Sequence, residues 1–139
     1  MRILILNGPN LNKLGERRED HYGSLTLNKI EDTILNEFPD DNFTFIQSNL
    51  EGELVTYIQN SEKEYDGLII NPGGYTHTSV AIKDALEIIK IPKIEVHLSN
   101  LSGREEYRQK LITTASCNGY ISGFKEKGYL AAIYLLKKL

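Results

Sequence analysis

Residues 14–23 (LGERREDHYG) place two arginines and a tyrosine on one short segment that two glycines bracket. The phenol of tyrosine has an ordinary pKa of about 10, so it is a weak base at neutral pH. A guanidinium held against the phenol favours the phenolate and lowers that pKa. Arg17 and Tyr22 would therefore form a strong base if the segment closed over a site, with Gly15 and Gly23 as hinges. Composition alone favours the alternative, a solvated charged loop.

A histidine at the end of an apolar run is the second candidate for proton transfer. Imidazole titrates near neutral pH, and His97 ends the run in IEVHLSN (94–100). Glu95 interrupts that run, so in a buried strand it would need a partner. It could orient the imidazole or pair with a lysine at a sheet edge. Arg104 and Arg108 share a face if their segment is helical, and one could clamp a carboxylate or merely pair with nearby acids.

A glycine-rich stretch, NPGGYTHTS (71–79), has the residues for an anion site. Gly73 and Gly74 permit positive φ, so successive backbone N–H groups can converge into a nest. A helix beginning near Thr78 would add its own N-terminal N–H groups, with His77 at the entrance. A tight turn followed by an ordinary helix cap explains the same residues equally well. The stretch matches neither common nucleotide-binding glycine motif.

These candidates lie at or near the ends of short apolar runs. Near-continuous Ile, Leu and Val suit strands that are buried on both faces, as in a parallel sheet. Ligands of such sheets bind outside the carboxyl ends of the strands, which is where polar residues end the runs. The predicted strands are 3–7, 43–47, 67–71, 94–97 and 119–122, and they end at Asn7, Gln47, Asn71, His97 and Ser122.

Amphipathic stretches alternate with these runs and predict crossover helices on both faces of the sheet. Apolar residues at helical spacing occur at 27–38, at 54–58, at 80–88 and in a last helix at about 125–138. Thr78 or Ser79 could cap the third of these helices. The segment 98–118 has no regular pattern. The sequence thus predicts one doubly wound α/β domain over residues 1–139.

Composition limits the classes of partner and the cellular compartment that are compatible with this sequence. The 139 residues are 40% hydrophobic and 25% charged, as in ordinary globular domains. A net charge of −3 argues weakly against nucleic acid or an anionic membrane as the main partner. The single cysteine, Cys117, excludes an internal disulfide framework and fits a reducing compartment. No apolar run reaches the length of a membrane span, so we expect a cytoplasmic protein.

Five motifs resemble those of type II 3-dehydroquinate dehydratase in their residues and in their order: NGPNLNKLGER…YG, QSNLEGEL, NPGGYTHTSVAIKDAL, IEVHLSNLSGREEYR and GYISGF…GYLAAI. The resemblance implies a flavodoxin-like fold with a five-stranded parallel sheet. It implies a homo-oligomer, usually a dodecamer built as four trimers. The implied reaction dehydrates 3-dehydroquinate to 3-dehydroshikimate in the shikimate pathway to aromatic amino acids, although some relatives serve quinate breakdown. It implies no cofactor, and no residue cluster has metal-ligand spacing.

Matching positions carry the family's roles onto this chain. Tyr22 resembles the base, Arg17 the lid arginine that activates it, His97 the general acid and Asn10 the asparagine that supports the enolate. Glu95 resembles the partner of the histidines. The substrate-binding positions are Asn71, His77, Asp84, Leu98, Ser99 and Arg108, with Gly73 and Arg104 as supporting residues.

The chain departs from the family pattern at several positions. Glu19 stands where the lid commonly has proline, so the lid is expected to be more mobile. Arg18 adds a second guanidinium beside Arg17, and either could reach the phenol. His21 and Ser102 stand where an apolar residue and a histidine are common. None of these changes removes a group that the chemistry needs.

The alternative to an enzyme is a catalytically silent flavodoxin-like module that only binds a ligand. The presence of Tyr22, Arg17 and His97 together argues against it. A phospho-acceptor receiver would need acidic residues where Asn7 and Asn71 end their strands.

Overall fold

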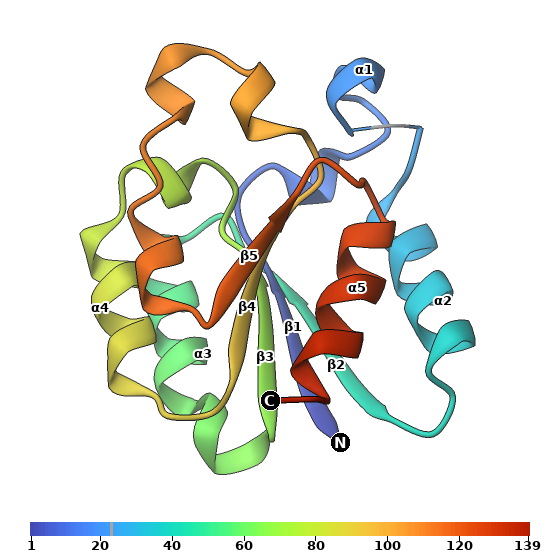
Figure 1. The fold of residues 1–139 in the computed structure, drawn as a ribbon, viewed down its shortest axis with the longest axis vertical. Coiled ribbons are helices and arrows are strands. Elements are labelled where there is room, and N and C mark those ends of the chain that lie inside the picture. The colour runs from blue at the N-terminus through green and yellow to red at the C-terminus, as the bar shows by residue number, and fades with distance from the viewer. Residues whose placement is uncertain (23) are drawn as a thin grey trace.

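The computed structural model describes residues 1–22 and 24–139, with the backbone alone at Glu19 and Tyr22. A central sheet of five strands runs through the molecule, and helices cover both of its faces (Figure 1). All neighbouring strands are parallel, in the order β2-β1-β3-β4-β5. The strands are β1 (Arg2–Asn7), β2 (Asn42–Gln47), β3 (Gly67–Asn71), β4 (Lys93–His97) and β5 (Gly119–Ser122). Each strand ends at the residue that the sequence predicted.

Alternate side chains of the strands enter two separate cores. In β1, Ile3 and Ile5 pack against α2 (Leu27–Glu37) and α5 (Lys127–Leu136). Leu4 and Leu6 point to the opposite face, towards the other two long helices. Burying each such side chain stabilises the fold by roughly 1.5–3 kcal/mol. Both faces are therefore apolar, which explains why the strands read as continuous apolar runs.

The second core lies under α3 (Glu51–Glu64) and α4 (Val80–Ile88), on the face opposite α2 and α5 (Figure 1). Ser79 caps α4, because its Oγ accepts a hydrogen bond from the backbone N–H of Ile82 at 2.9 Å. The predicted helices are thus confirmed, although α5 is shorter than expected. No helix in the described part of the chain has the length and apolar character that a membrane span needs.

The strand order is that of flavodoxin-like folds, as predicted, and it reverses between β1 and β3. In the sheet register, Asn7 of β1 lies between Gln47 of β2 and Asn71 of β3. Two other strand ends, His97 and Ser122, pair on β4 and β5. Polar side chains from all five strands therefore meet along one edge of the sheet.

The two segments for which the sequence predicted no regular element contain short helical turns. Residues 98–118 connect β4 to β5 through three 3₁₀ helices, Leu101–Gly103, Glu106–Arg108 and Thr113–Ser116. Within the segment expected to be a loop, α1 (Glu19–Tyr22) forms a single helical turn. Gly15 adopts a φ of 90°, which suits its predicted role as a hinge, whereas Gly23 lies outside the described residues.

Candidate active site

A cavity of about 90 Å³ opens at the carboxyl edge of the sheet. Its walls come from the loops after β1 and β3, from the segment before α1 and from the residues after β4. Most of the positions that the sequence singled out line it: Asn10, Arg17, Asn71, Gly73, His77, His97, Leu98, Ser99, Arg104 and Arg108. The other lining residues are Pro9, Leu11, Gly74 and Leu101.

His97 and Glu95 form a buried pair beside this cavity. Nε2 of His97 lies 2.6 Å from Oε1 of Glu95, and the two side chains are 6% and 0% exposed. An ionised carboxylate only accepts hydrogen bonds, so Nε2 carries the proton and donates it. Nδ1 is then the ring nitrogen that can serve the cavity. Of the two partners expected for Glu95, the structure has the imidazole rather than a lysine.

Two threonine hydroxyls, which the sequence analysis did not single out, hold the same carboxylate. Oγ1 of Thr76 lies 2.6 Å from Oε1 of Glu95, and Oγ1 of Thr113 lies 2.7 Å from Oε2. Both threonines are fully buried. A buried carboxylate on a central strand needs donors, and that requirement was the one signal that could have prompted a search for them.

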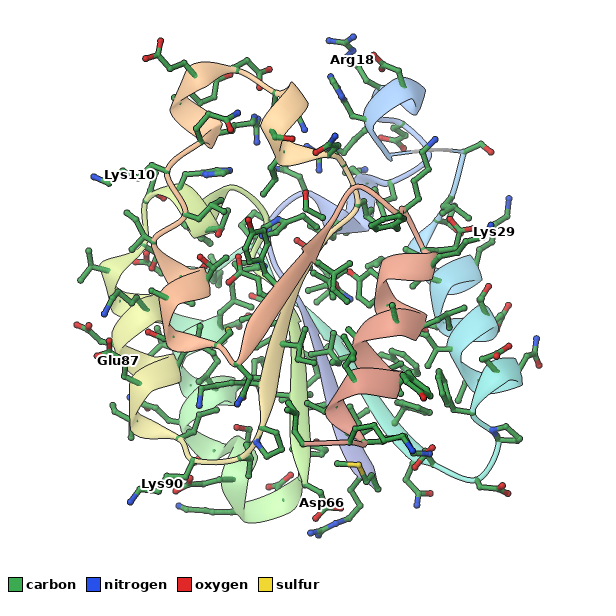
Figure 2. All side chains as sticks on the ribbon, viewed as in Figure 1. Arg18, Lys29, Asp66, Glu87, Lys90 and Lys110 are labelled. Carbon is green, nitrogen blue, oxygen red and sulfur yellow. The ribbon has the colours of Figure 1, made fainter. Side chains whose placement is uncertain are left out.

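The imidazole of His77 is held by the backbone of the 98–118 segment. Its Nδ1 lies 2.8 Å from the carbonyl oxygen of Lys110, so Nδ1 donates and Nε2 is the unprotonated nitrogen of the neutral ring. The Lys110 side chain itself points away from the molecule (Figure 2). Partial burial lowers the pKa of His77, and the positive charge of Arg108 lowers it further. His77 therefore presents a neutral imidazole to the cavity at neutral pH.

Asn71 is fixed by the last helix and by its own loop. Its Nδ2 donates to the hydroxyl of Tyr129 at 3.2 Å, and its Oδ1 accepts from the N–H of Gly73 at 3.1 Å. The Tyr129 hydroxyl in turn donates to Oδ1 of Asn7 at 2.6 Å. Complete burial raises the pKa of Tyr129, so it stays a neutral donor. Tyr129 is a further supporting residue that sequence reasoning missed.

Asn10 adopts a left-handed backbone conformation with φ 68° and ψ −4°. Its N–H donates to Oδ1 of Asn49 at 3.1 Å, and Gln47 donates to the same oxygen at 3.0 Å. Gly73 also has a positive φ, 62°, and a Cβ there would lie 2.9 Å from the carbonyl oxygen of Pro9. The close approach of the two loops therefore requires glycine at this position.

The predicted anion nest is only partly formed. Of the two glycines, Gly73 has a positive φ and Gly74 does not. Both glycines belong to a 3₁₀ helix, Gly73–His77, and α4 begins at Val80, two residues after Thr78, near the predicted start. Ser79 is the N-cap of α4, because its Oγ accepts a hydrogen bond from the N–H of Ile82, the third residue of the helix. His77 thus lies on a turn of its own, one step before the helix.

The arginines at the cavity have ordered partners. Nη1 of Arg104 donates to Oγ of Ser99 at 3.0 Å, and Nε of Arg108 donates to Glu105 at 2.8 Å. Arg17 lines the cavity from the segment before α1. Together with two imidazoles these guanidiniums make a site suited to an anionic ligand. The described residues include no group of three His, Cys, Asp or Glu side chains that could hold a metal ion.

Asp84 lies outside this set, and the side chain of Tyr22 is not described. Asp84 is exposed on α4 and does not line the cavity of its own chain. It shares the outer face of that helix with Val80 and Ile88, which are 58% and 61% exposed. The backbone of Tyr22 ends α1, and its side chain lies outside the described residues.

Comparisons with known proteins agree with this architecture. The sequence model of the family Dehydroquinase class II matches residues 1–137. A curated 3-dehydroquinate dehydratase of Clostridium perfringens (strain SM101 / Type A) is 50% identical over 141 residues, covering 99% of this chain and 97% of that protein.

Two solved structures are similar over nearly the whole chain. The crystal structure of type II dehydroquinase from Butyrivibrio crossotus DSM 2876 superposes with a TM-score of 0.95 at 43% identity, covering 99% of this chain and 97% of that one. The type II dehydroquinase from Propionibacterium acnes gives a TM-score of 0.91 at 34% identity, with 98% and 96% covered. The family model and these full-length matches show that the chain belongs to the class II dehydroquinase family.

Proposed function

We propose that this protein is a type II 3-dehydroquinate dehydratase, which removes water from 3-dehydroquinate to give 3-dehydroshikimate. The observation that supports this most strongly is the buried His97–Glu95 pair at the cavity. One ring nitrogen is occupied by a carboxylate, at 2.6 Å, and the other is left to serve a ligand. That arrangement suits an imidazole that must deliver a proton and then take one back.

The first proposed step removes the proton next to the ketone of the substrate. Tyr22, as phenolate, takes this proton, and the electron pair of the broken C–H bond moves into an enolate. Arg17 favours the phenolate by its positive charge. Asn10 supports the enolate oxygen, because hydrogen-bond donors in a closed, dry site stabilise developing negative charge.

The second proposed step expels the hydroxyl on the neighbouring carbon. The enolate re-forms the ketone, the new C=C bond forms, and the C–O bond breaks. Protonated Nδ1 of His97 gives its proton to the departing oxygen, which leaves as water. Proton transfers on opposite faces of the ring suit an anti elimination. These steps use only groups of the protein.

Substrate binding is assigned to the remaining cavity positions. The backbone N–H groups of Leu98 and Ser99 would hold the substrate carboxylate, with Arg108 supplying positive charge. Asn71 and the neutral His77 would bind ring hydroxyls or the ketone. Support comes from their place on the cavity wall and from the fixed orientation of both side chains.

Asp84 connects the proposed function to assembly. Its exposed position on α4 puts it out of the cavity of its own chain, yet it matches a substrate-binding position. We infer that the outer face of α4 lies near the cavity of a neighbouring copy in a homo-oligomer. Val80 and Ile88 give that face apolar surface for such a contact. The resemblance makes a dodecamer of four trimers the expected assembly.

The biosynthetic shikimate pathway and a cytoplasmic location remain predictions. A product with a conjugated enone carboxylate suits a route towards aromatic compounds, and the single cysteine suits a reducing compartment.

The test is ultraviolet absorbance after purified, chelator-treated protein is mixed with 3-dehydroquinate. A steady rise from the conjugated product is expected, and Tyr22→Phe should abolish the rise while leaving the fold intact. An unchanged rate in Tyr22→Phe would exclude this tyrosine as the base. A flat trace from folded wild-type protein, in an assay that a known dehydroquinase passes, would favour the silent binding module.

A further inference from the structure

We propose that Thr113 is a positioning residue for the general acid: its hydroxyl fixes the Glu95 carboxylate in the orientation that presents His97 to the cavity. The inference rests on the proposed function, because it assigns a kinetic role to a residue behind the proposed acid. Thr113 does not line the cavity.

Side-chain donors contact both oxygens of the Glu95 carboxylate. Oε1 of Glu95 accepts from Nε2 of His97 and from Oγ1 of Thr76, each at 2.6 Å. Oε2 accepts from Oγ1 of Thr113 at 2.7 Å. Within the residues that the structure describes, Thr113 is the one side-chain donor recorded at Oε2.

The number of hydroxyl protons fixes which acceptor each threonine uses. Each threonine hydroxyl has one proton, and the two hydroxyl oxygens lie 2.9 Å apart. If Thr113 donated to Thr76, Oε2 of a fully buried carboxylate would lose its donor. Hydrogen bonds to a charged acceptor are the stronger ones, so both hydroxyls donate to Glu95 instead. The carboxylate is thus held at both oxygens, from two different segments.

Two joined segments hold the two oxygens of the carboxylate. A carboxylate held at Oε1 alone can turn about its terminal bond, and its contact with the imidazole turns with it. Thr76 lies on the turn after β3, whereas Thr113 lies on the 3₁₀ helix before β5. These two segments are tied together by the backbone bond from Ile112 N–H to the Thr76 carbonyl, at 2.7 Å. Donors fixed on two joined segments define the plane of the carboxylate and with it the direction of the His97 ring.

The same connection also serves the cavity directly. The 98–118 segment contributes Arg108 to the cavity wall and the Lys110 carbonyl that holds His77. Thr113 follows these residues and joins them to the buried carboxylate. The irregular segment therefore carries binding groups and, through Thr113, an orienting contact to the general acid.

Thr113→Val tests the proposal, because valine keeps the branched shape and removes the hydroxyl. The expected result is a kcat about 10- to 100-fold lower, by analogy with the loss of residues that orient metal-binding histidines. KM should stay within about two-fold, because binding groups are untouched. Exchange of the substrate α-proton with solvent deuterium should persist, since it needs the base and not the acid.

Thr114→Val is the matched control. Thr114 is the next residue on the same 3₁₀ helix, and its hydroxyl donates to the carbonyl of Leu111 at 3.1 Å. Its kcat should equal that of the wild type. Thr113→Ser keeps a hydroxyl and should restore most of the lost kcat. Equal kcat values for folded Thr113→Val and Thr114→Val would overturn the proposal and leave Thr113 with a merely structural role.

A spectroscopic readout separates this inference from the proposed function. In protein labelled with ¹⁵N-histidine, the Nε2–H proton of His97 should resonate far downfield in the wild type and in Thr114→Val. In Thr113→Val it should shift or broaden, and an unchanged signal would overturn the inference. If the wild type shows no turnover, the proposed function fails, while this signal still decides whether Thr113 orients the pair. If the valine variant folds poorly, the same measurements are made on Thr113→Ala, with Thr114→Ala as its control.

Discussion

Arg17 and Arg18 are adjacent in the chain, yet only Arg17 faces the cavity. The Arg18 side chain is 70% exposed and its Nη2 lies 2.6 Å from Oδ2 of Asp20, at the outer end of the molecule (Figure 2). The sequence left open which guanidinium serves the phenol of Tyr22. We propose Arg17, because it lines the cavity and Arg18 does not.

This difference predicts a large effect of one alanine substitution and a small effect of the other. Arg17→Ala should raise the pH at which activity appears by roughly 1–3 units, since a neighbouring positive charge shifts an acidic group by that amount. Arg18→Ala should change the rate by no more than a few-fold, because exposed ion pairs contribute little. The pH dependence of kcat/KM in both variants measures the difference. The reverse pattern would assign the activating role to Arg18.

His97→Ala should separate proton removal from elimination. The loss of a general acid is expected to lower kcat by about 10²- to 10⁴-fold, because no group then protonates the departing hydroxyl. Exchange of the α-proton with deuterated solvent should fall much less. Mass spectrometry of recovered substrate measures the exchange. Equal losses in both processes would argue that His97 is not the acid.

Asp84 gives a prediction about assembly. Asp84→Ala and His97→Ala should each be poorly active, the former through a higher KM. If Asp84 serves the cavity of another copy, unfolding the two variants together and refolding them in equal amounts should regain activity. Random pairing leaves about a quarter of the sites with both native residues. Activity that stays at the mean of the two separate variants would mean that Asp84 does not act across copies.

Tyr129→Phe should cost both stability and binding. Without the hydroxyl, Oδ1 of Asn7 and Nδ2 of Asn71 are left buried without their recorded partner, at a cost of about 1–3 kcal/mol. Urea unfolding measures the free energy, and KM should rise because Asn71 loses one of its two anchors. Tyr134→Phe on the same helix is the control, since Tyr134 is 59% exposed and should leave both values unchanged. Equal stability of the two variants would contradict the role of the Tyr129 hydroxyl.

His77 should titrate below its ordinary pKa of 6.5, because its partial burial disfavours the imidazolium. A pKa that is lower in the folded state means that folding favours the neutral ring. The resulting stability is present above the unfolded pKa and is lost as pH falls through the folded one. The NMR titration of His77 should therefore have its midpoint below the value found in urea. A midpoint at or above that value would contradict the buried, neutral assignment.

The strands could be predicted because both of their faces are buried, which makes them continuous apolar runs. The four long helices could be predicted because their apolar residues recur at helical spacing. Ile3 and Leu4 illustrate this, since consecutive residues enter different cores. The single turn of α1 could not be predicted, because four residues are too few to form a helix without tertiary contacts. Residues 98–118 have no regular apolar spacing, because their short turns depend on the surface that they pack against.

The site was predictable where function falls on strand ends and unpredictable where it depends on distant donors. His97 and Asn71 end their strands, so topology alone brought them to one edge. The hydroxyl of Thr113 reaches Glu95 across 18 residues of chain, from a segment whose sequence has no regular pattern. Tyr129 contacts Asn71 across 58 residues, and no local pattern reports such a contact.

The hydrogen bond from Tyr129 to Asn7 joins residues that are 122 positions apart, so it can form only late in the synthesis of this chain segment. A ribosome releases the chain from its N-terminus, and all five strands have been made before α5 is complete. Until then Asn7 and Asn71, at the carboxyl ends of β1 and β3, lack the Tyr129 hydroxyl that anchors them. A nascent chain halted before α5 should therefore hold its sheet residues but lack an ordered pocket. Competence to bind would therefore follow the synthesis of α5 rather than the synthesis of the last strand.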